Sequence, residues 1–395
     1  MRTPVVLACG QGDAGGVVDV LADKPGTVVV RHRFDGQVVV RTVATSDGES
    51  DWPMEPANGC VACTVRNDLL VLLRRLHRRG DVQRIVVHLT PWLEPEAVCW
   101  AINNVRVSVG PGYVDGPAAR DVCIDAVVTC VDTAKWLNQA LGDAELDDGR
   151  TVAQVVVGQA EFADALVLTS PDPKTLSVLR RLSPMARITV GSQRVETALA
   201  HLEPGTRRGR STLPHDPLLA GQPPLDPDGD IGLLVFSARR PFHPQRLHTA
   251  LDLLLDGVVR ARGRLWLANR FDDVMWFESA GGGLRFEYAG RWLAAMNSSE
   301  LAYADPERRA LAAADWHGRL GDRHVSITVL VCGAEPEDIV EALRGALLTN
   351  DELSRPDEWA SYADPFGDWH EDPCDDVAEP AGDVAGAREV DGGHS

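Results

Sequence analysis

The sequence has no long apolar run, no signal-peptide cleavage pattern near its first residues and few cysteines. Because no stretch of about 18 consecutive apolar residues occurs, we expect no transmembrane helix. The N-terminus carries one arginine and a short apolar run without a cleavage pattern, which predicts a first strand rather than a signal peptide. Eight cysteines among 395 residues are too sparse and irregular for a disulfide framework. These absences predict a cytoplasmic protein with reduced thiols and no membrane partner.

Positive charge is also scarce, with 39 Lys and Arg against 58 Asp and Glu and a net charge of −19. Residues 351–395 hold 14 of the acidic residues and only two arginines, which predicts an acidic tail that could engage a basic partner. Repulsion of phosphate argues against DNA as a partner. The candidate rRNA contacts lie in two arginine clusters and are Arg74, Arg75, Arg78, Arg79, Arg207, Arg208 and Arg210. Each cluster could equally be a solvated helix face or part of a linker.

The first 200 residues alternate short apolar runs with segments of helical length. Strands are expected at 5–10, 27–34, 84–90, 125–132, 165–169 and 187–191, and helices at 64–79 and 175–182. Runs that are apolar on both faces are typical of buried parallel strands joined by right-handed crossovers. We therefore expect an α/β fold with a doubly wound, mostly parallel sheet, which usually binds nucleotides at the carboxyl ends of its strands.

A change of composition predicts the domain organisation. Residues 1–203 form the α/β domain, and residues 204–230, rich in Pro, Gly, Asp and Arg, read as a linker. Residues 231–353 combine strand-like and helical stretches, which indicates a smaller α+β domain. The acidic tail covers 354–395 and is expected to be disordered after about residue 375.

The first expected strand ends in a glycine-rich turn, GQGDAGGVVDVL (10–21), where a phosphate-binding loop would lie. The working motif GxxxxGK[ST] supplies backbone N–H groups, a lysine for the phosphates and a hydroxyl for Mg²⁺. Aligned on its glycines, this turn has Gly16 in place of the lysine and Val17 in place of the hydroxyl. The residues of this degenerate nucleotide site are Gly10, Gly12, Asp13, Gly15, Gly16 and Val17. Weak or absent GTP and Mg²⁺ binding is expected, with an ordinary connector as the alternative.

Cys60 and Cys63 form a Cys-x-x-Cys pair just before the expected helix. Thr64 is a suitable N-cap, and a helix N-terminus favours the thiolate form of a nearby cysteine. Zinc usually takes four ligands, so Glu55, His88 or Cys9 would have to complete the site. Zinc binding, two structural thiols and a redox pair are the three interpretations of this pair.

Read together, these motifs resemble the CobW family of P-loop GTPases, often described as zinc metallochaperones. GCVACTVRNDL (59–69) resembles the family's cysteine motif, HLTPWLEP (88–95) its second nucleotide element, and FADALVLTSPD (162–172) its guanine-binding strand. The resemblance extends to about residue 353. It implies a GTPase-like domain followed by the family's C-terminal domain, and it implies that the cysteines with a glutamate bind metal.

The departures from the family pattern fall on the nucleotide and metal motifs. Besides the changes at Gly16 and Val17, His88 replaces a Glu and Ala62 replaces a metal-binding cysteine. Thr169 and Ser170 replace the guanine-reading pair, so that only Asp172 of that motif is kept. Loss of the lysine and hydroxyl removes stabilisation that phosphoryl transfer requires. GTP hydrolysis is therefore not expected.

Long stretches such as LLVLLRRLHRR, FSARRPFHPQRLH and DPFGDWH resemble an actinobacterial branch of the family. This resemblance implies a cytosolic adaptor that acts under zinc limitation. It would help to deliver a protein-Y-type ribosome hibernation factor to the 30S subunit and so silence the ribosome. The alternative function is that of a zinc metallochaperone GTPase.

Overall fold

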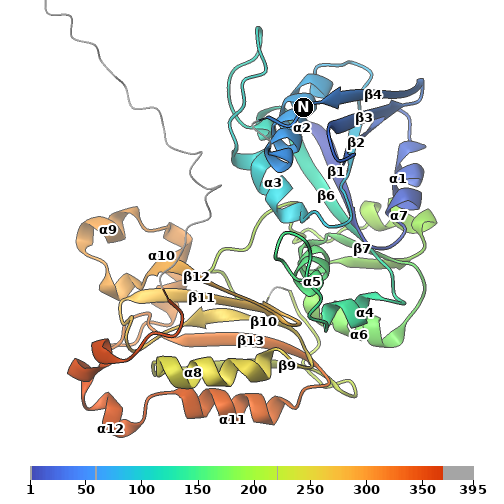
Figure 1. Ribbon diagram of the computed structural model, residues 1–395. Coiled ribbons are helices and arrows are strands. Elements are labelled where there is room, and N and C mark those ends of the chain that lie inside the picture. The colour runs from blue at the N-terminus through green and yellow to red at the C-terminus, as the bar shows by residue number, and fades with distance from the viewer. Residues whose placement is uncertain (1, 58–59, 220, 368–395) are drawn as a thin grey trace, which may run out of the picture.

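The computed structural model describes residues 2–57, 60–219 and 221–367. The first domain is built on an eight-stranded sheet in the order β4-β3-β2-β5-β1-β6-β7-β8 (Figure 1). Its strands are β1 (Thr3–Gly10), β2 (Thr27–Phe34), β3 (Val39–Thr45), β4 (Gly48–Met54), β5 (Arg84–His88), β6 (Val122–Val131), β7 (Ala165–Leu168) and β8 (Arg187–Val190). The pairs among β2, β5, β1, β6, β7 and β8 are all parallel. The expected doubly wound α/β fold is confirmed.

Helices cover both faces of this sheet. They are α1 (Ala14–Ala22), α2 (Val61–His77), α3 (Pro95–Asn104), α4 (Trp136–Ala140), α5 (Val152–Phe162), α6 (Pro173–Leu182) and α7 (Val195–Ala200). Side chains of α1 and α7 pack on one face, and those of α2 and α3 pack on the other. This burial on both faces explains the continuous apolar runs of the central strands.

The antiparallel hairpin β3–β4 was not predicted from the sequence. β4 lies at the edge of the sheet, and nearly all of its residues are exposed. Its sequence GESDWPM is charged and contains a proline, as edge strands often are. It therefore lacks the apolar alternation that indicates a half-buried strand.

The second domain is a five-stranded antiparallel sheet in the order β12-β11-β10-β13-β9 (Figure 1). The strands are β9 (Ile231–Ala238), β10 (Val258–Leu265), β11 (Asp273–Ala280), β12 (Gly283–Arg291) and β13 (Val325–Cys332). The helices are α8 (Pro244–Ala250), α9 (Ser298–Tyr303), α10 (Pro306–Ala314), α11 (Pro336–Ala346) and α12 (Asn350–Leu353). Residues of α8 and α11 pack on one face of the sheet around the buried Trp266 and Trp292.

The other face of this sheet meets the first domain. Ile231, Val259 and Leu330 belong to one buried cluster with residues of α5 and α6. The segment 204–230 has no helix or strand among its described residues, and Thr206 and Leu218 within it are buried. The two domains therefore share an apolar contact in addition to the connecting segment. The disorder expected after about residue 375 concerns residues outside the described ranges.

Candidate functional site

The glycine-rich loop after β1 packs tightly on the end of β6. Gly10 has a φ of +105°, a conformation that favours glycine, and a Cβ there would overlap the backbone of Cys130. A Cβ on Gly12 would lie 2.8 Å from the Val131 backbone, and the Gly12 N–H donates to Cys130 O at 2.9 Å. Open space surrounds Gly15. The close approach of two backbones explains Gly10 and Gly12 without a ligand.

Asp13 is the N-cap of α1, at the helix start whose N–H groups would bind a phosphate. Its Oδ1 accepts a hydrogen bond from Gly16 N at 2.9 Å and caps α1. Any side chain at Gly16 would overlap this carboxylate, and Val17 is fully buried in the core. A carboxylate already satisfies a helix N-terminal donor, and its charge repels phosphate. The loop holds neither the cation nor the hydroxyl of a working phosphate site.

The residues that the resemblance assigns to guanine reading also serve the fold. The hydroxyls of Thr169 and Ser170 lie 3.1 and 2.8 Å from the Thr133 hydroxyl. Asp172 Oδ2 accepts from Thr175 N at 2.8 Å and caps α6. Hydrogen bonding from Thr175 lowers the pKa of the Asp172 carboxyl. The one guanine-specificity residue that is kept therefore has a structural use in this chain.

The structure brings Cys60 and Cys63 together at the start of α2. Cys60, and not the predicted Thr64, is the N-cap, because its Sγ accepts from Cys63 N at 3.2 Å. The Thr64 hydroxyl instead donates to Cys60 O at 2.8 Å and accepts from Ala57 N. Hydrogen bonding from the Cys63 side chain is the main cause of a lowered Cys60 pKa. This direction favours the thiolate form of Cys60.

The other expected zinc ligands do not complete this pair. Cys9 is buried beside Thr129, and burial raises the pKa of its thiol to about 12. His88 Nδ1 accepts from Arg31 Nε at 3.2 Å, and burial followed by the Arg31 charge lowers its pKa. Glu55 is exposed. Among the described residues no group of three His, Cys, Asp or Glu could hold a metal ion, so the pair offers at most two of the four ligands that zinc usually takes.

The first arginine cluster differs from the expected basic surface. Arg74 is 2% exposed and binds Asp121 at 2.7 Å, so the expectation that it contacts RNA is wrong. Arg78 donates to Gly112 O and lies over the Tyr113 ring. Arg79 pairs with Asp81, and Arg75 is exposed. Three of the four arginines that the sequence suggested as phosphate contacts therefore bind groups within the protein.

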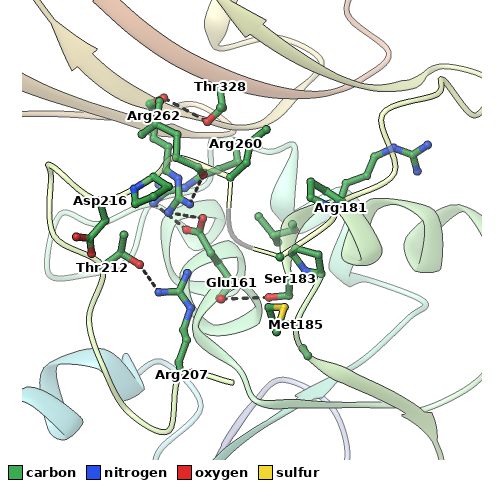
Figure 2. Close-up of a pocket in the computed structure, with 18 of the residues that line it drawn as sticks. Glu161, Arg181, Ser183, Met185, Arg207, Thr212, Asp216, Arg260, Arg262 and Thr328 are labelled. Atoms are coloured by element: carbon green, nitrogen blue, oxygen red, sulfur yellow. Dashed lines mark hydrogen bonds and ion pairs between the residues drawn. The ribbon is translucent and has the colours of Figure 1, made fainter. Parts of the chain in front are cut away.

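The second arginine cluster is divided between the surface and the interior. Arg208 is exposed, pairs with Asp125 at 3.0 Å, and has a positive φ of 46°. Arg210 is exposed and donates to the backbone oxygens of Thr206 and Arg207. Arg207 is half-buried and reaches between the two domains, where it donates to the Thr212 hydroxyl (Figure 2). It is therefore not a surface contact of the kind expected.

A buried ion cluster that the sequence reading missed lies between the domains. Glu161 of α5 accepts from Arg262 at 2.7 Å and from Arg260 at 2.9 Å (Figure 2). Arg260 also pairs with Glu278 at 2.9 Å. The alternation of arginine in RARGRL (260–265) is the signal that could have indicated a charged face of β10.

Comparison with known proteins decides the family. The model for the "CobW/HypB/UreG, nucleotide-binding domain" matches residues 29–188, and that for the "Cobalamin synthesis protein cobW C-terminal domain" matches residues 231–347. A zinc chaperone of Mycobacterium tuberculosis is 64% identical over 392 residues, covering 98% of each chain. The chain belongs to the CobW family. The match to the nucleotide-binding domain begins at residue 29, so it does not include the glycine-rich loop (residues 10–17).

A more distant relative also has a name that refers to zinc. "Zinc-regulated GTPase metalloprotein activator 1" of Dictyostelium discoideum is 24% identical over 83% of this chain and 73% of its own. The zinc-bound YjiA GTPase of E. coli is 14% identical, with 88% of this chain and 100% of that one covered at a TM-score of 0.39. None of the helices in the described residues is long and apolar enough to span a bilayer.

Proposed function

We propose that this CobW-family protein acts in zinc homeostasis by binding a partner protein, without hydrolysing GTP. The observation that carries the proposal is the loop after β1, where the Asp13 carboxylate bonds the N–H of Gly16. Phosphoryl transfer depends on positive charge and a metal ion held against the phosphates. This loop presents a negative charge instead.

Zinc enters the proposal through the relatives and through one local feature. The names of the related proteins refer to zinc. The Cys60–Cys63 pair supplies two sulfur ligands at a helix N-terminus. Two thiolates leave two positions of a tetrahedral zinc ion open. Zinc held here would need further ligands from solvent or a partner, which suits a protein that responds to zinc or passes it on.

The finer proposal concerns the partner. The resemblance to the actinobacterial branch supports a ribosome hibernation factor as the partner and the 30S subunit as its destination under zinc limitation. Arg75 is exposed on α2 and is available for a phosphate contact at that surface. The acidic stretch 375–395 is proposed to engage a basic partner.

The second candidate function is a zinc chaperone that hydrolyses GTP, favoured by the names of the relatives. The two candidates differ in a measurement on the purified full chain. A fluorescent GTP analogue is titrated with Mg²⁺, with and without zinc, while phosphate release is followed. We expect no saturable binding and no turnover. Zinc-stimulated hydrolysis would overturn the main proposal and favour the GTPase.

A rebuilt loop provides the matched control for this measurement. The combined variant Asp13→Gly, Gly16→Lys, Val17→Thr restores the motif and removes the carboxylate that Gly16 would meet. We expect it to gain measurable affinity for the analogue. If the native loop binds as tightly as the rebuilt one, the assignment of these three positions is wrong.

The partner is tested by affinity capture of the full chain from zinc-depleted cells and from zinc-replete cells. We expect a hibernation factor and 30S components to co-purify only after zinc depletion. Their absence under both conditions would overturn the finer proposal. The same capture with residues 375–395 deleted tests the tail, and unchanged recovery of the hibernation factor would exclude its role.

A further inference from the structure

A large cavity lies between the two domains, beneath the segment 204–230. Its volume is about 660 Å³, and a second cavity of about 490 Å³ shares Glu161, Arg207, Thr212, Arg260 and Arg262 with it. We call the larger one the interdomain cavity. A space of this size at a domain boundary is typical of small-molecule sites. It is separate from the glycine-rich loop and from the Cys60–Cys63 pair, which do not line it.

The lining of the interdomain cavity has more arginines than acidic residues. Arg260 and Arg262 share Glu161, and the second acid near them, Glu278, binds Arg260 alone. Burial, with the neighbouring charges of Arg260 and Arg207, lowers the pKa of Arg262. Burial is the largest cause of this lowering, the Glu161 charge opposes it, and Glu161 and Glu278 raise the pKa of the neighbouring Arg260.

Arg207 supplies the excess positive charge. No carboxylate among the described residues forms an ion pair with it, and its guanidinium bonds the Thr212 hydroxyl and lies 5.9 Å from the Phe162 ring. Figure 2 shows it pointing toward Glu161 from the side opposite Arg260 and Arg262. A guanidinium has five N–H donors, so most of those on Arg207 are available to an acceptor.

None of the other acids near the cavity forms an ion pair with Arg207 among the described residues. Glu96, which lines the second cavity, is close enough for the Arg207 charge to oppose the burial that raises its pKa. Asp216 Oδ2 accepts from Leu213 N at 2.7 Å, and Glu307 is exposed. Arg210 adds a further cation to the lining. Arg181 turns its guanidinium away, toward Ser177 and Asp226.

One wall of the interdomain cavity is apolar. Its side chains come from the end of α6 and the chain that follows it, from the 204–230 segment and from the face of the second sheet that meets the first domain. They include Leu182, Met185, Leu218, Leu233 and Leu330. A ligand that fits both parts would have an anionic group and an apolar body.

We propose that the interdomain cavity binds a small phosphate monoester with an apolar body, its phosphate on Arg207 and its body along the wall of Leu182 and Met185. A phosphate carries up to two negative charges and three acceptor oxygens, which an arginine can hold in bidentate form. Because the cavity is bounded by both domains and the 204–230 segment, such a ligand would join them. The proposal goes beyond the proposed function, and neither depends on the other.

Calorimetric titration of the full chain with n-hexyl phosphate tests the proposal. Inorganic phosphate and n-hexanol are the matched probes for the two halves of the ligand, and hexanoate tests the choice of anion. We expect hexyl phosphate to bind at least about tenfold more tightly than any of the three, and to raise the melting temperature as any native-state ligand does. Hexanol or hexanoate binding as tightly as hexyl phosphate would overturn the assignment.

Substitution of one arginine localises the site. Arg207→Gln should weaken hexyl phosphate binding at least about tenfold, because a charge-assisted hydrogen bond is lost. Arg106→Gln changes an exposed arginine outside the cavity and should leave the affinity unchanged. Equal affinities of Arg207→Gln and the native chain would refute the site. A crystal structure with hexyl phosphate bound elsewhere would refute it even if Arg207→Gln failed to fold.

Discussion

Replacement of Arg74 by methionine should destabilise the first domain strongly, although this arginine lies in a sequence that looks like a basic surface. Its Nε binds Asp121 Oδ2 at 2.7 Å. Its terminal nitrogens donate to Val114 O at 2.8 Å, Gly116 O at 3.2 Å and Val107 O at 3.4 Å. One side chain thus connects α2 to the loop between α3 and β6.

The size of the effect follows from burial. Arg74 is 2% exposed, and the Asp121 side chain is 19% exposed. Removal of one partner of a buried ion pair costs about 3–5 kcal/mol because the other charge is left uncompensated. For a domain of about 200 residues this corresponds to a melting temperature lower by roughly 6–20 °C.

Arg75 is the matched control, since it is the next residue on the same helix and its side chain is exposed. Arg75→Met should change the free energy of unfolding by no more than about 0.5 kcal/mol. Scanning calorimetry of both variants and the native chain measures the difference. A melting temperature of Arg74→Met within about 2 °C of the native value would refute the reasoning, because the buried contacts would then contribute little.

Three further predictions concern single groups. Asp13→Ala removes the cap of α1 and should cost about 1 kcal/mol in urea unfolding, and no loss would contradict its capping role. Cys60 should be alkylated by iodoacetamide at pH 8 well before Cys9, whose pKa is raised to about 12 by burial, as peptide mass spectrometry can check. Burial, followed by the Arg308 charge, lowers the pKa of His215 to about 4. Between about pH 6.5 and pH 4 this histidine is therefore protonated in the unfolded chain but neutral in the native chain. Stability should therefore fall from pH 7 to pH 4, and less steeply in His215→Gln; identical pH profiles would contradict this.

The parallel strands could be predicted because their burial on both faces leaves a direct mark on the sequence. β1, β2 and β6 are apolar runs, and each was expected at nearly the residues where it occurs. β4 left no such mark, because an exposed edge strand needs polar residues. The start of α2 was misplaced by three residues, since a cysteine sulfur caps it and Thr64 lies inside its first turn.

Features of the candidate site that depend on contacts between distant segments could not be predicted from the sequence. Nothing local distinguishes the buried Arg74 from the exposed Arg75, because the distinction depends on Asp121 and the carbonyls near it. The pairing of Glu161 with Arg260 and Arg262 likewise needs the packing of α5 on a strand about 100 residues away. Motif spacing cannot indicate such pairs.

In the loop after β1, groups of the protein itself accept hydrogen bonds from backbone N–H groups. The first N–H groups of a helix require acceptors, which a bound phosphate can provide. Here the Asp13 carboxylate provides one to Gly16, and the Gly12 N–H finds the backbone oxygen of Cys130. With Val17 fully buried beneath it, α1 is supported by the protein alone. The absence of a lysine at Gly16 therefore need not destabilise the domain.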